Sequence, residues 1–309
     1  MGREDILNKI EALIRDIIPE ENIFIDEPMK NHTTFRIGGP ADILVKPSDI
    51  KQIKNVYMAC RKENEPCMII GNGSNVLVSD DGIRGVVILL LDNYERIRVE
   101  NDMITAQAGA RLSKIGAAAL RGSLTGFEFA CGIPGTLGGA CIMNAGAYGG
   151  EMKDILLSVT AMDKNGNIRE YQPHEMQLAY RSSRFAKEGL IVLEAKLQLQ
   201  KGNRSEIEAY MKDLAARRRE KQPLEYPSAG STFKRPEGFF AGKLIMDAGL
   251  RGYSVGDACV SEKHCGFVIN KGTATAEDVC TLMKNVSAKI KDTFGVTLEP
   301  EVRIIGREL

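Results

Sequence analysis

The chain has 309 residues, enough for two or three domains, and 43% of them are apolar, which suffices for ordinary hydrophobic cores. Its 41 basic residues balance its 41 acidic residues, so no overall charge would attract it to nucleic acid or to an anionic membrane. We therefore expect neither as a partner.

The sequence also lacks the usual signals for export or for a structural metal. No apolar run approaches the roughly 20 residues that span a bilayer, and the amphipathic N-terminal segment lacks the apolar core of a signal peptide. The seven cysteines are scattered and form no CxxC pair, which favours neither zinc nor disulfides. We expect a cytoplasmic protein with reduced thiols and no metal.

Hydrophobic periodicity and turn residues predict a mixture of helices and strands along the chain. Predicted helices cover residues 4–18, 47–64, 112–121, 204–222, 243–248 and 276–293. Predicted strands cover residues 41–46, 67–70, 76–78, 86–91, 96–100, 103–108, 156–163, 167–171, 190–200, 258–261, 266–270 and 302–305. Ser48 is the expected N-cap of the second helix, Asn165-Gly166 a hairpin turn, and 227–236 a loop. Because the elements do not alternate strictly, the predicted class is α+β.

The only basic run, Arg217-Arg218-Arg219, lies on the predicted helix 204–222. Acidic residues Glu206 and Glu208 precede it on the same helix. A charge run on an amphipathic helix is typical of a solvent-exposed face, and we expect that here.

A first glycine segment, Gly71-Asn72-Gly73-Ser74-Asn75, lies between two apolar strands. Its main-chain N–H groups could form a nest for a phosphate, because glycine permits positive φ angles and close approach. It matches neither the Walker A motif nor GxGxxG. By itself it is equally consistent with a plain tight turn.

A second glycine segment lies within residues 126–150, which are rich in Gly, Ala and Pro. Apolar residues such as Phe127, Phe129 and Ile133 are interleaved with them, so ordered backbone is favoured over a flexible linker. Two such segments in one domain favour a pyrophosphate ligand. A pair of closely packed turns stays the alternative.

Six motifs resemble, in the same order, those of the UDP-N-acetylenolpyruvoylglucosamine reductases. They are Asn31–Gly39 (NHTTFRIGG), Gly71–Asp80, Gly132–Gly149, Tyr180–Phe185 (YRSSRF), Ala229–Lys234 (AGSTFK) and Glu299–Arg303 (EPEVR). The resemblance extends over about residues 23–306. Ser261-Glu262-Lys263-His264 also fits, although Cys265 stands where the family commonly has Ala.

The resemblance implies an FAD-binding fold of the vanillyl-alcohol-oxidase type, with two α+β subdomains, in residues 1–200. It implies an α+β substrate-binding domain in residues 201–309, whose terminal strand, about 299–306, returns toward the flavin domain. No segment corresponds to the inserted Tyr-bearing loop of the longer family form, so the chain resembles the compact form. The expected contacts of noncovalent FAD are Gly71, Asn72, Gly73, Ser74, Asn75, Gly132, Pro134, Gly135, Thr136, Gly138, Gly139, Asn144, Ala145 and Gly146.

The resemblance further implies that NADPH reduces the flavin, which then passes a hydride to C3 of the enolpyruvyl group of a UDP-sugar. Ser231 is the expected proton donor to C2. Arg181 is the expected clamp for the carboxylate, with Arg184 as a weaker rival. Glu301 is expected either to be protonated in a dry site or to orient Arg181 or the substrate. Expected substrate contacts are Tyr180, Gly230 and Lys234.

Two other functions stay open at this point. One is a different noncovalent FAD oxidoreductase of the same fold, and the other is a catalytically inactive nucleotide-binding protein. Residues 71–75 contain no histidine that could bond covalently to flavin. We expect no direct role for His32 or His264, and expect Cys131 and Cys141 to be packing residues.

Overall fold

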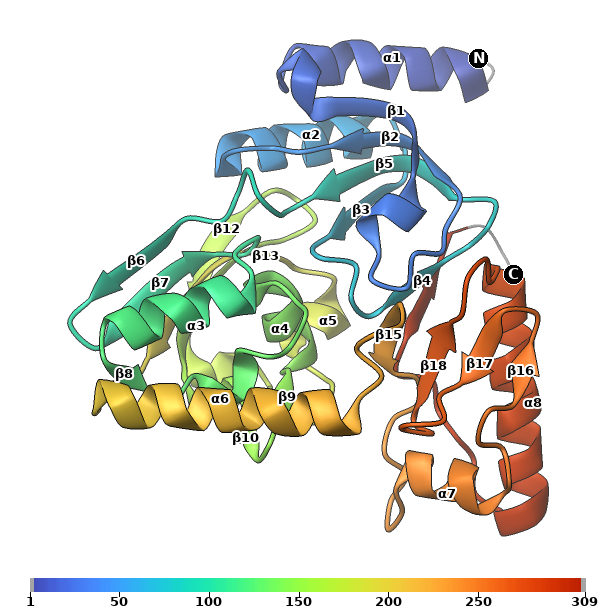
Figure 1. Ribbon diagram of the computed structural model, residues 1–309. Coiled ribbons are helices and arrows are strands. Elements are labelled where there is room, and N and C mark those ends of the chain that lie inside the picture. The colour runs from blue at the N-terminus through green and yellow to red at the C-terminus, as the bar shows by residue number, and fades with distance from the viewer. Residues whose placement is uncertain (1–2, 307–309) are drawn as a thin grey trace. The chain divides into compact units, whose positions relative to one another are not determined.

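The structure, a computed structural model, describes residues 3–306, which fold into two compact units (Figure 1). Unit 1 comprises the chain up to Phe24, Ile43–Asn72 and Gly85–Arg218. Unit 2 comprises Ile25–Asp42, Gly73–Arg84 and the chain from Arg219 onward. The functional division at residue 200 stays a prediction.

Helices and strands are mixed along the chain without strict alternation, as the predicted α+β class requires. The helices are α1 Arg3–Arg15, α2 Ile50–Lys62, α3 Leu112–Arg121, α4 Leu137–Met143, α5 Arg184–Glu188, α6 Arg204–Lys221, α7 Ala241–Asp247 and α8 Ala276–Phe294. The strands are β1 Ile23–Pro28, β2 Pro40–Val45, β3 Cys67–Ile70, β4 Val76–Val78, β5 Ile83–Leu89, β6 Ile97–Glu100, β7 Met103–Gln107, β8 Leu124–Thr125, β9 Gly146–Ala147, β10 Gly150–Glu151, β11 Leu156–Met162, β12 Ile168–Tyr171, β13 Ile191–Gln198, β14 Gln200–Lys201, β15 Ser228–Ser231, β16 Ser254–Val255, β17 Ala258–Val260, β18 Phe267–Asn270 and β19 Arg303–Ile305.

The largest sheet of unit 1 has the strand order β12-β11-β13-β7-β6 and is antiparallel. In its central strand, Leu193, Ala195 and Leu197 are fully buried, which confirms the predicted alternation. Helices α3 and α4 pack against this sheet (Figure 1). The predicted strand 190–200 is interrupted, because Gln200–Lys201 pairs with β8 instead.

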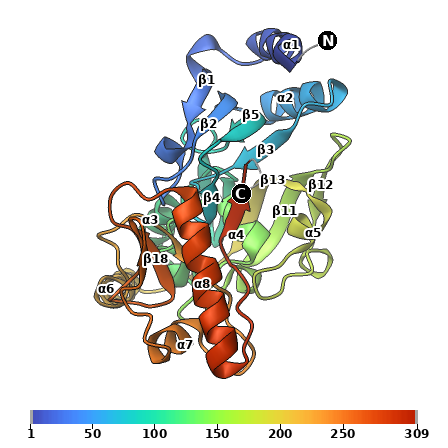
Figure 2. The ribbon, with the colours of Figure 1, turned by 90° about the vertical axis from the view of Figure 1, so that its right-hand side faces the viewer.

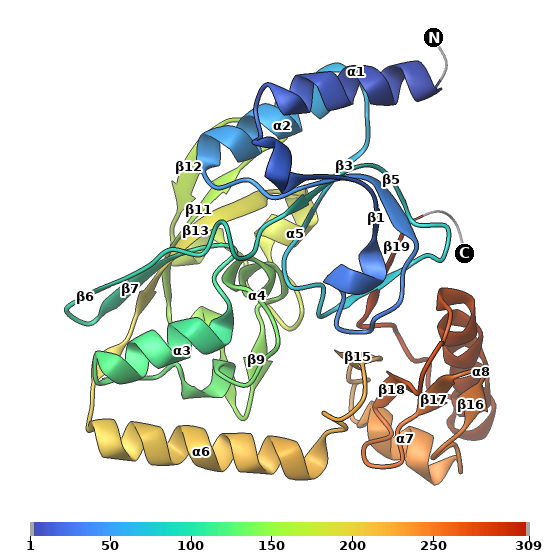
Figure 3. The same ribbon diagram turned by 45° about the horizontal axis from the view of Figure 1, so that its top comes forward.

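A second sheet has the order β1-β2-β5-β3, and its strands β3 and β5 are parallel. Helix α2 packs against β3, and α1 packs against α2 (Figure 3). The apolar stripe of α1 supplies Ile10 and Ile14, both fully buried, to the core. The helix ends at Arg15, a few residues before Pro19, because proline cannot continue it.

The N-terminus of α2 corrects one sequence prediction. Asp49, not Ser48, is the N-cap, and its carboxylate accepts a 2.8 Å hydrogen bond from the N–H of Gln52. Ser48 instead donates through both its main chain and its hydroxyl to the side-chain oxygen of Gln52. Both residue types cap helices well, so the sequence alone does not distinguish them.

Unit 2 contains an antiparallel sheet in the order β15-β18-β17-β16, covered by α8, which also packs against α7 (Figure 2). Its core includes Phe233, Val268, Leu282 and Val286, each at most 4% exposed. The predicted loop 227–236 begins with strand β15, which pairs with β18 and was missed because Ser228–Ser231 contains no large apolar residue. Among residues 3–306, no helix is both long and apolar enough to cross a bilayer.

The terminal strand β19 pairs in parallel with β4, the strand that follows the first glycine segment in the sequence. Just beyond β4, the Asp80 carboxylate accepts hydrogen bonds from the N–H groups of Ala276 (2.9 Å) and Glu277 (3.2 Å) at the start of α8. Thr275 and Asp278 form a capping box at the same helix end. Asp80, the last residue of the Gly71–Asp80 motif, is therefore a helix cap.

We predict that Asp80→Ala lowers the free energy of unfolding by about 1–2 kcal/mol, because two helix N–H groups lose their acceptor. Denaturant unfolding followed by circular dichroism measures this. Asp81→Ala is the matched control, since within residues 3–306 Asp81 is hydrogen-bonded through its main-chain N–H alone, to the Ser79 hydroxyl. Equal losses in the two variants would contradict the capping role.

Candidate active site

The first glycine segment begins in unit 1, where it lies directly against the second. The side-chain amide of Asn72 donates a 2.7 Å hydrogen bond to the carbonyl oxygen of Pro134. A Cβ atom added at Gly71 would lie 2.2 Å from Oγ1 of Thr136, far inside contact distance. The two segments can approach this closely only because residue 71 is glycine.

The second glycine segment is fixed along the end of β7 by main-chain hydrogen bonds. Gly135 accepts one of 3.0 Å from Leu112, and Gly138 donates one of 2.8 Å to Ala108. Thr136 is the N-cap of α4, so Gly138 and Gly139 lie in the first turn of that helix.

One side of this backbone is open. A Cβ atom at Gly139 would have its nearest neighbour 3.7 Å away, and one at Gly149 would meet nothing within 4 Å. A main chain without side chains, next to a helix start, lets phosphate oxygens approach the N–H groups closely. These residues therefore fit the pyrophosphate of a dinucleotide cofactor.

Asn144 ends α4 in the left-handed conformation, with φ 42°, and only 1% of it is exposed. Its side-chain amide donates to Oε2 of Glu151 (3.0 Å) and to the carbonyl of Ala179 (3.2 Å). Its side-chain oxygen accepts from the N–H of Lys153 (2.9 Å). The side chain predicted to contact cofactor thus joins the second glycine segment to the segment that carries Arg181.

Ala145 and Gly146 continue this connection. Ala145 accepts a 3.0 Å hydrogen bond from the N–H of Met152, and Gly146 pairs with Glu151 in the β9–β10 hairpin. A Cβ atom at Gly146 would lie 2.8 Å from Cγ of Glu151, so glycine is required for this pairing.

Arg181 lies in a two-residue turn. Ala179 and Ser182 exchange main-chain hydrogen bonds of 3.0 and 3.1 Å, which places Tyr180 and Arg181 at the turn's tip. Arg181 has φ 51°, which is uncommon for a residue other than Gly or Asn. Its guanidinium lies 5.1 Å from the centre of the Tyr180 ring, and Tyr180 is 50% exposed.

The charge of Arg181 also reaches Glu151. The pKa of Glu151 is lowered, mainly by its hydrogen bond with Lys153 and further by the positive charge of Arg181. Glu151 is thus an ionised neighbour of the turn, and it is held by Asn144.

The rival arginine, Arg184, is committed to local structure. Its Nε donates a 2.7 Å hydrogen bond to Glu188 one turn along α5, and its guanidinium lies 5.8 Å from the Tyr171 ring. The preceding Ser183 caps α5 and donates to the carbonyl of Ile142. These contacts hold the Arg184 side chain against α5 and the Tyr171 ring.

In unit 2, the first glycine segment is joined to β15. A Cβ atom at Gly73, which has φ 57°, would lie 2.1 Å from the carbonyl oxygen of His32. The carbonyl of Gly73 accepts a 3.2 Å hydrogen bond from Thr34. Thr34 also bonds Ser228 through its main chain (3.2 Å) and its hydroxyl (2.7 Å). The half-buried Ser74 follows Gly73.

Ser231 ends β15 after an irregularity in the strand. The pairing with β18 changes register between Ser228 and Ser231, and Gly230 between them has φ 78°. Nothing lies within 4 Å of the place where a Cβ of Gly230 would be. Ser231 is half-buried, and in the part of the chain that the structure describes its hydroxyl has no hydrogen-bond partner. The hydroxyl is therefore available to a ligand.

The segment that carries Glu301 runs beside the one that carries Ser231. The N–H of Glu301 donates a 2.8 Å hydrogen bond to the carbonyl of Thr232. Asn75, at the end of the first glycine segment, donates from its side-chain amide to the carbonyl of Glu301 (3.1 Å) and accepts from the N–H of Arg303 (3.0 Å). Three predicted site segments thus meet in unit 2.

Lys234, a predicted substrate contact, pairs with Glu299 at 3.1 Å, and the two side chains are 41% and 70% exposed. Such an exposed pair contributes little to stability and exchanges readily for another partner. The fold therefore does not depend on the ammonium group of Lys234.

The His264 side chain is held by contacts within the fold. Its Nδ1 accepts a 3.1 Å hydrogen bond from the N–H of Gly266, its ring packs edge-on against Phe267, and burial lowers its pKa. Burial raises the pKa of Cys131 and of Cys141 to about 12, so both are thiols at neutral pH. Among residues 3–306, no group of three or more His, Cys, Asp or Glu side chains could hold a metal ion.

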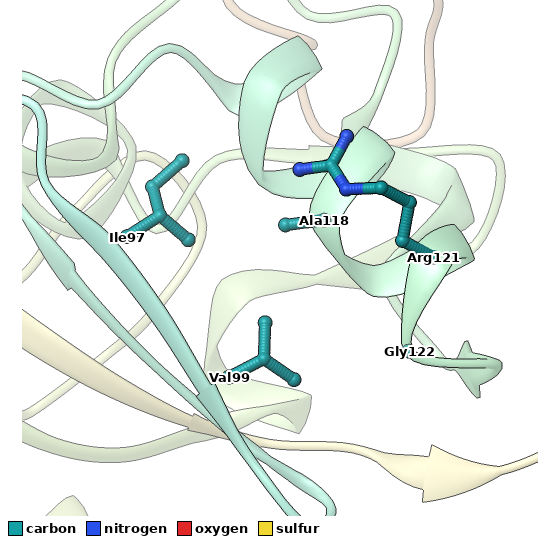
Figure 4. Close-up of a pocket in the computed structure, with 5 residues that line it drawn as sticks. All are labelled: Ile97, Val99, Ala118, Arg121 and Gly122. Carbon is teal, nitrogen blue, oxygen red and sulfur yellow. The ribbon is translucent and has the colours of Figure 1, made fainter.

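Unit 1 also has an open groove of about 330 Å³ between β6 and α3, lined by Ile97, Val99, Ala118, Arg121 and Gly122 (Figure 4). None of the predicted site residues lines this groove. The glycine segments and the Arg181 turn lie elsewhere in unit 1, so the groove does not belong to the candidate site.

A mixed α+β fold in which two adjoining glycine segments fit a pyrophosphate is typical of a dinucleotide-binding protein. Residues 41–172 match the family model described as an FAD binding domain. Residues 222–305 match the C-terminal domain of UDP-N-acetylenolpyruvoylglucosamine reductase. The protein is therefore an oxidoreductase with FAD as its cofactor, as predicted.

Proteins of the same name are similar over nearly the whole chain. The UDP-N-acetylenolpyruvoylglucosamine reductase of Clostridioides difficile (strain 630) is 55% identical, covering 95% of this chain and 96% of the relative. That of Syntrophomonas wolfei is 54% identical, covering 96% and 99%. The crystal structure of the Thermus caldophilus reductase has a TM-score of 0.78 at 34% identity, covering 91% and 97%. The chain belongs to the UDP-N-acetylenolpyruvoylglucosamine reductase family, which confirms the resemblance.

We predict that Asn144→Ala lowers the free energy of unfolding by about 2–4 kcal/mol, because buried groups lose their partners and Ala disfavours the left-handed conformation. Chemical denaturation measures this. Asn144→Gly is the matched variant, since it removes the hydrogen bonds but tolerates φ 42°. If the Gly variant were as stable as wild type, the side-chain network would not hold this segment.

Proposed function

We propose that the protein reduces the enolpyruvyl group of UDP-N-acetylenolpyruvoylglucosamine to give UDP-N-acetylmuramate, a cytoplasmic step of peptidoglycan precursor synthesis with NADPH as hydride donor. The substrate follows from the name that the relatives share. The observation that carries the proposal is that the segments bearing Ser231, Glu301 and Asn75 are hydrogen-bonded into one region of unit 2.

Bound FAD supplies the hydride, which comes from NADPH and goes to C3 of the enolpyruvyl group. Gly71–Asn75 and the main chain from Gly132 to Gly146 hold the cofactor in this proposal. Hydride addition at C3 leaves negative charge on C2 and on the attached carboxylate. The protein must stabilise this charge and then deliver a proton to C2.

Ser231 delivers that proton. Its hydroxyl is uncommitted within residues 3–306, and the neighbouring Gly230 leaves open space on its exposed side. An alcohol is a weak acid, so a fixed geometry beside an electron-rich carbon must compensate. The register change in β15 and the main-chain bonds of Thr232 support such a fixed position.

Arg181 binds the substrate carboxylate, because a guanidinium matches a carboxylate with two parallel hydrogen bonds and gains strength as charge develops. Its place at a turn tip and its unusual φ of 51° support this role. Glu301 orients the substrate or the guanidinium. Tyr180, Gly230 and Lys234 complete the substrate contacts, with Lys234 exchanging Glu299 for a substrate anion.

We predict that Ser231→Ala leaves reduction of the bound flavin by NADPH close to wild type and slows its reoxidation by substrate at least about 100-fold, the usual contribution of a general acid. Anaerobic stopped-flow absorbance of the flavin measures the two half-reactions separately.

Ser228→Ala is the control on the same strand, since Ser228 bonds Thr34 through its main-chain N–H and C=O groups. Equal slowing of both half-reactions by Ser231→Ala would remove this residue from proton donation. If wild-type enzyme reduced by NADPH were not reoxidised by this substrate without oxygen, the proposed function would fail in favour of another flavin reaction or an inactive binding protein.

For Arg181→Ala we predict a loss of about 100- to 1000-fold in turnover, because an interaction that strengthens in the transition state is removed. Steady-state kinetics measure kcat and KM separately. Arg181→Lys keeps the charge but not the paired hydrogen bonds and should recover only part of the loss. Arg184→Ala is the neighbouring control, and a change in KM alone would make Arg181 a binding residue only.

A further inference from the structure

Arg218 lies on the buried side of α6, contrary to the sequence prediction of a solvated face. The half-buried or buried residues Ile207, Met211, Leu214 and Arg218 follow one another at spacings of four, three and four, which places them on one helical stripe. Arg217 and Arg219 are exposed, as predicted. The prediction failed for Arg218 because the basic run was considered as a whole rather than by helical position.

The side chain of Arg218 lies against Gly132, at the start of the second glycine segment. A Cβ atom at Gly132 would lie 3.2 Å from Cδ and from a terminal guanidinium nitrogen of Arg218, so glycine makes room for this group. Burial lowers the pKa of Arg218, and the nearby hydroxyl of Tyr148 partly opposes this effect. Helix α6 passes beside the hairpin that carries Tyr148 in two views (Figures 1 and 3).

The charge of Arg218 is not balanced by an acidic side chain. Arg217 pairs with Asp213 at 2.8 Å, but within residues 3–306 no carboxylate lies at ion-pair distance from Arg218. A partly buried guanidinium without an anion loses hydration without compensation. The position is therefore suited to an anion supplied by a ligand.

We propose that Arg218 binds the pyrophosphate of FAD. The glycine backbone from Gly132 to Gly149 offers N–H groups to phosphate oxygens, and the guanidinium adds the full positive charge and paired donors that N–H groups lack. A diphosphate also occurs in UDP-sugars, and the same chemistry would recognise it. The FAD pyrophosphate is favoured because Arg218 contacts the glycine segment of the FAD-binding domain itself.

The test measures flavin binding to apoprotein by quenching of flavin fluorescence, without NADPH or substrate. A separate calorimetric titration measures binding of the UDP-sugar to the FAD-loaded protein. FAD and riboflavin, which lacks the pyrophosphate, are each titrated into wild type, Arg218→Met and the matched control Arg217→Met. Arg218→Met should raise the Kd of FAD about 10- to 100-fold, as expected for loss of a charge-assisted pair. The Kd of riboflavin should stay unchanged, and Arg217→Met should resemble wild type. Added KCl should weaken FAD binding less in Arg218→Met than in wild type.

Three outcomes would overturn the proposal. One is an unchanged Kd for FAD in Arg218→Met, and another is an equal loss of FAD and riboflavin, which would place Arg218 at the flavin ring. The third is normal FAD binding with weakened binding of the UDP-sugar, which would assign the residue to the substrate. If Arg218→Met does not fold, the ratio of FAD affinity to riboflavin affinity is measured in Arg218→Lys instead. A ratio below that of wild type supports the proposal, and an unchanged ratio overturns it. Because only binding and no turnover is measured, a negative result does not affect the proposed reaction.

Discussion

The main-chain hydrogen bond from Glu301 to Thr232 is the constraint on which the candidate site of unit 2 depends. It fixes the end of the chain beside β15, and Asn75 adds the first glycine segment to the same place. Since these bonds mostly involve main-chain groups, they hold the segments without using the side chains of Ser231 and Glu301. The hydroxyl of Ser231 therefore has no hydrogen-bond partner within residues 3–306, although the strand that carries it is half-buried.

In unit 1, a buried side chain holds the site segments together. Asn144 satisfies groups of three residues on two segments, and its loss would leave several part-buried donors and acceptors unpaired, which is more costly than the net value of the bonds. The Arg181 turn depends on this network through Ala179.

Elements with a strong period could be predicted from the sequence, and α3 and the alternating residues of β13 are examples. Helices α4 and α5 and strand β15 were missed because they are short and rich in small or polar residues, which carry little periodic signal. The fold class, the family and FAD followed from the motifs. The capping of α8 by Asp80 could not follow, because it joins residues far apart in the sequence, and Arg218 was missed although its helical spacing was readable.

Residues 73–80, which follow the start of the first glycine segment, are attached at two points in unit 2. Gly73 has no space for a side chain against His32, and Asp80 bonds the first N–H groups of α8. The length of chain between these two points is therefore fixed. Insertion or deletion of a single residue between them would have to release either the glycine turn or the helix end, so the number of residues in this stretch cannot change without loss of one of these contacts.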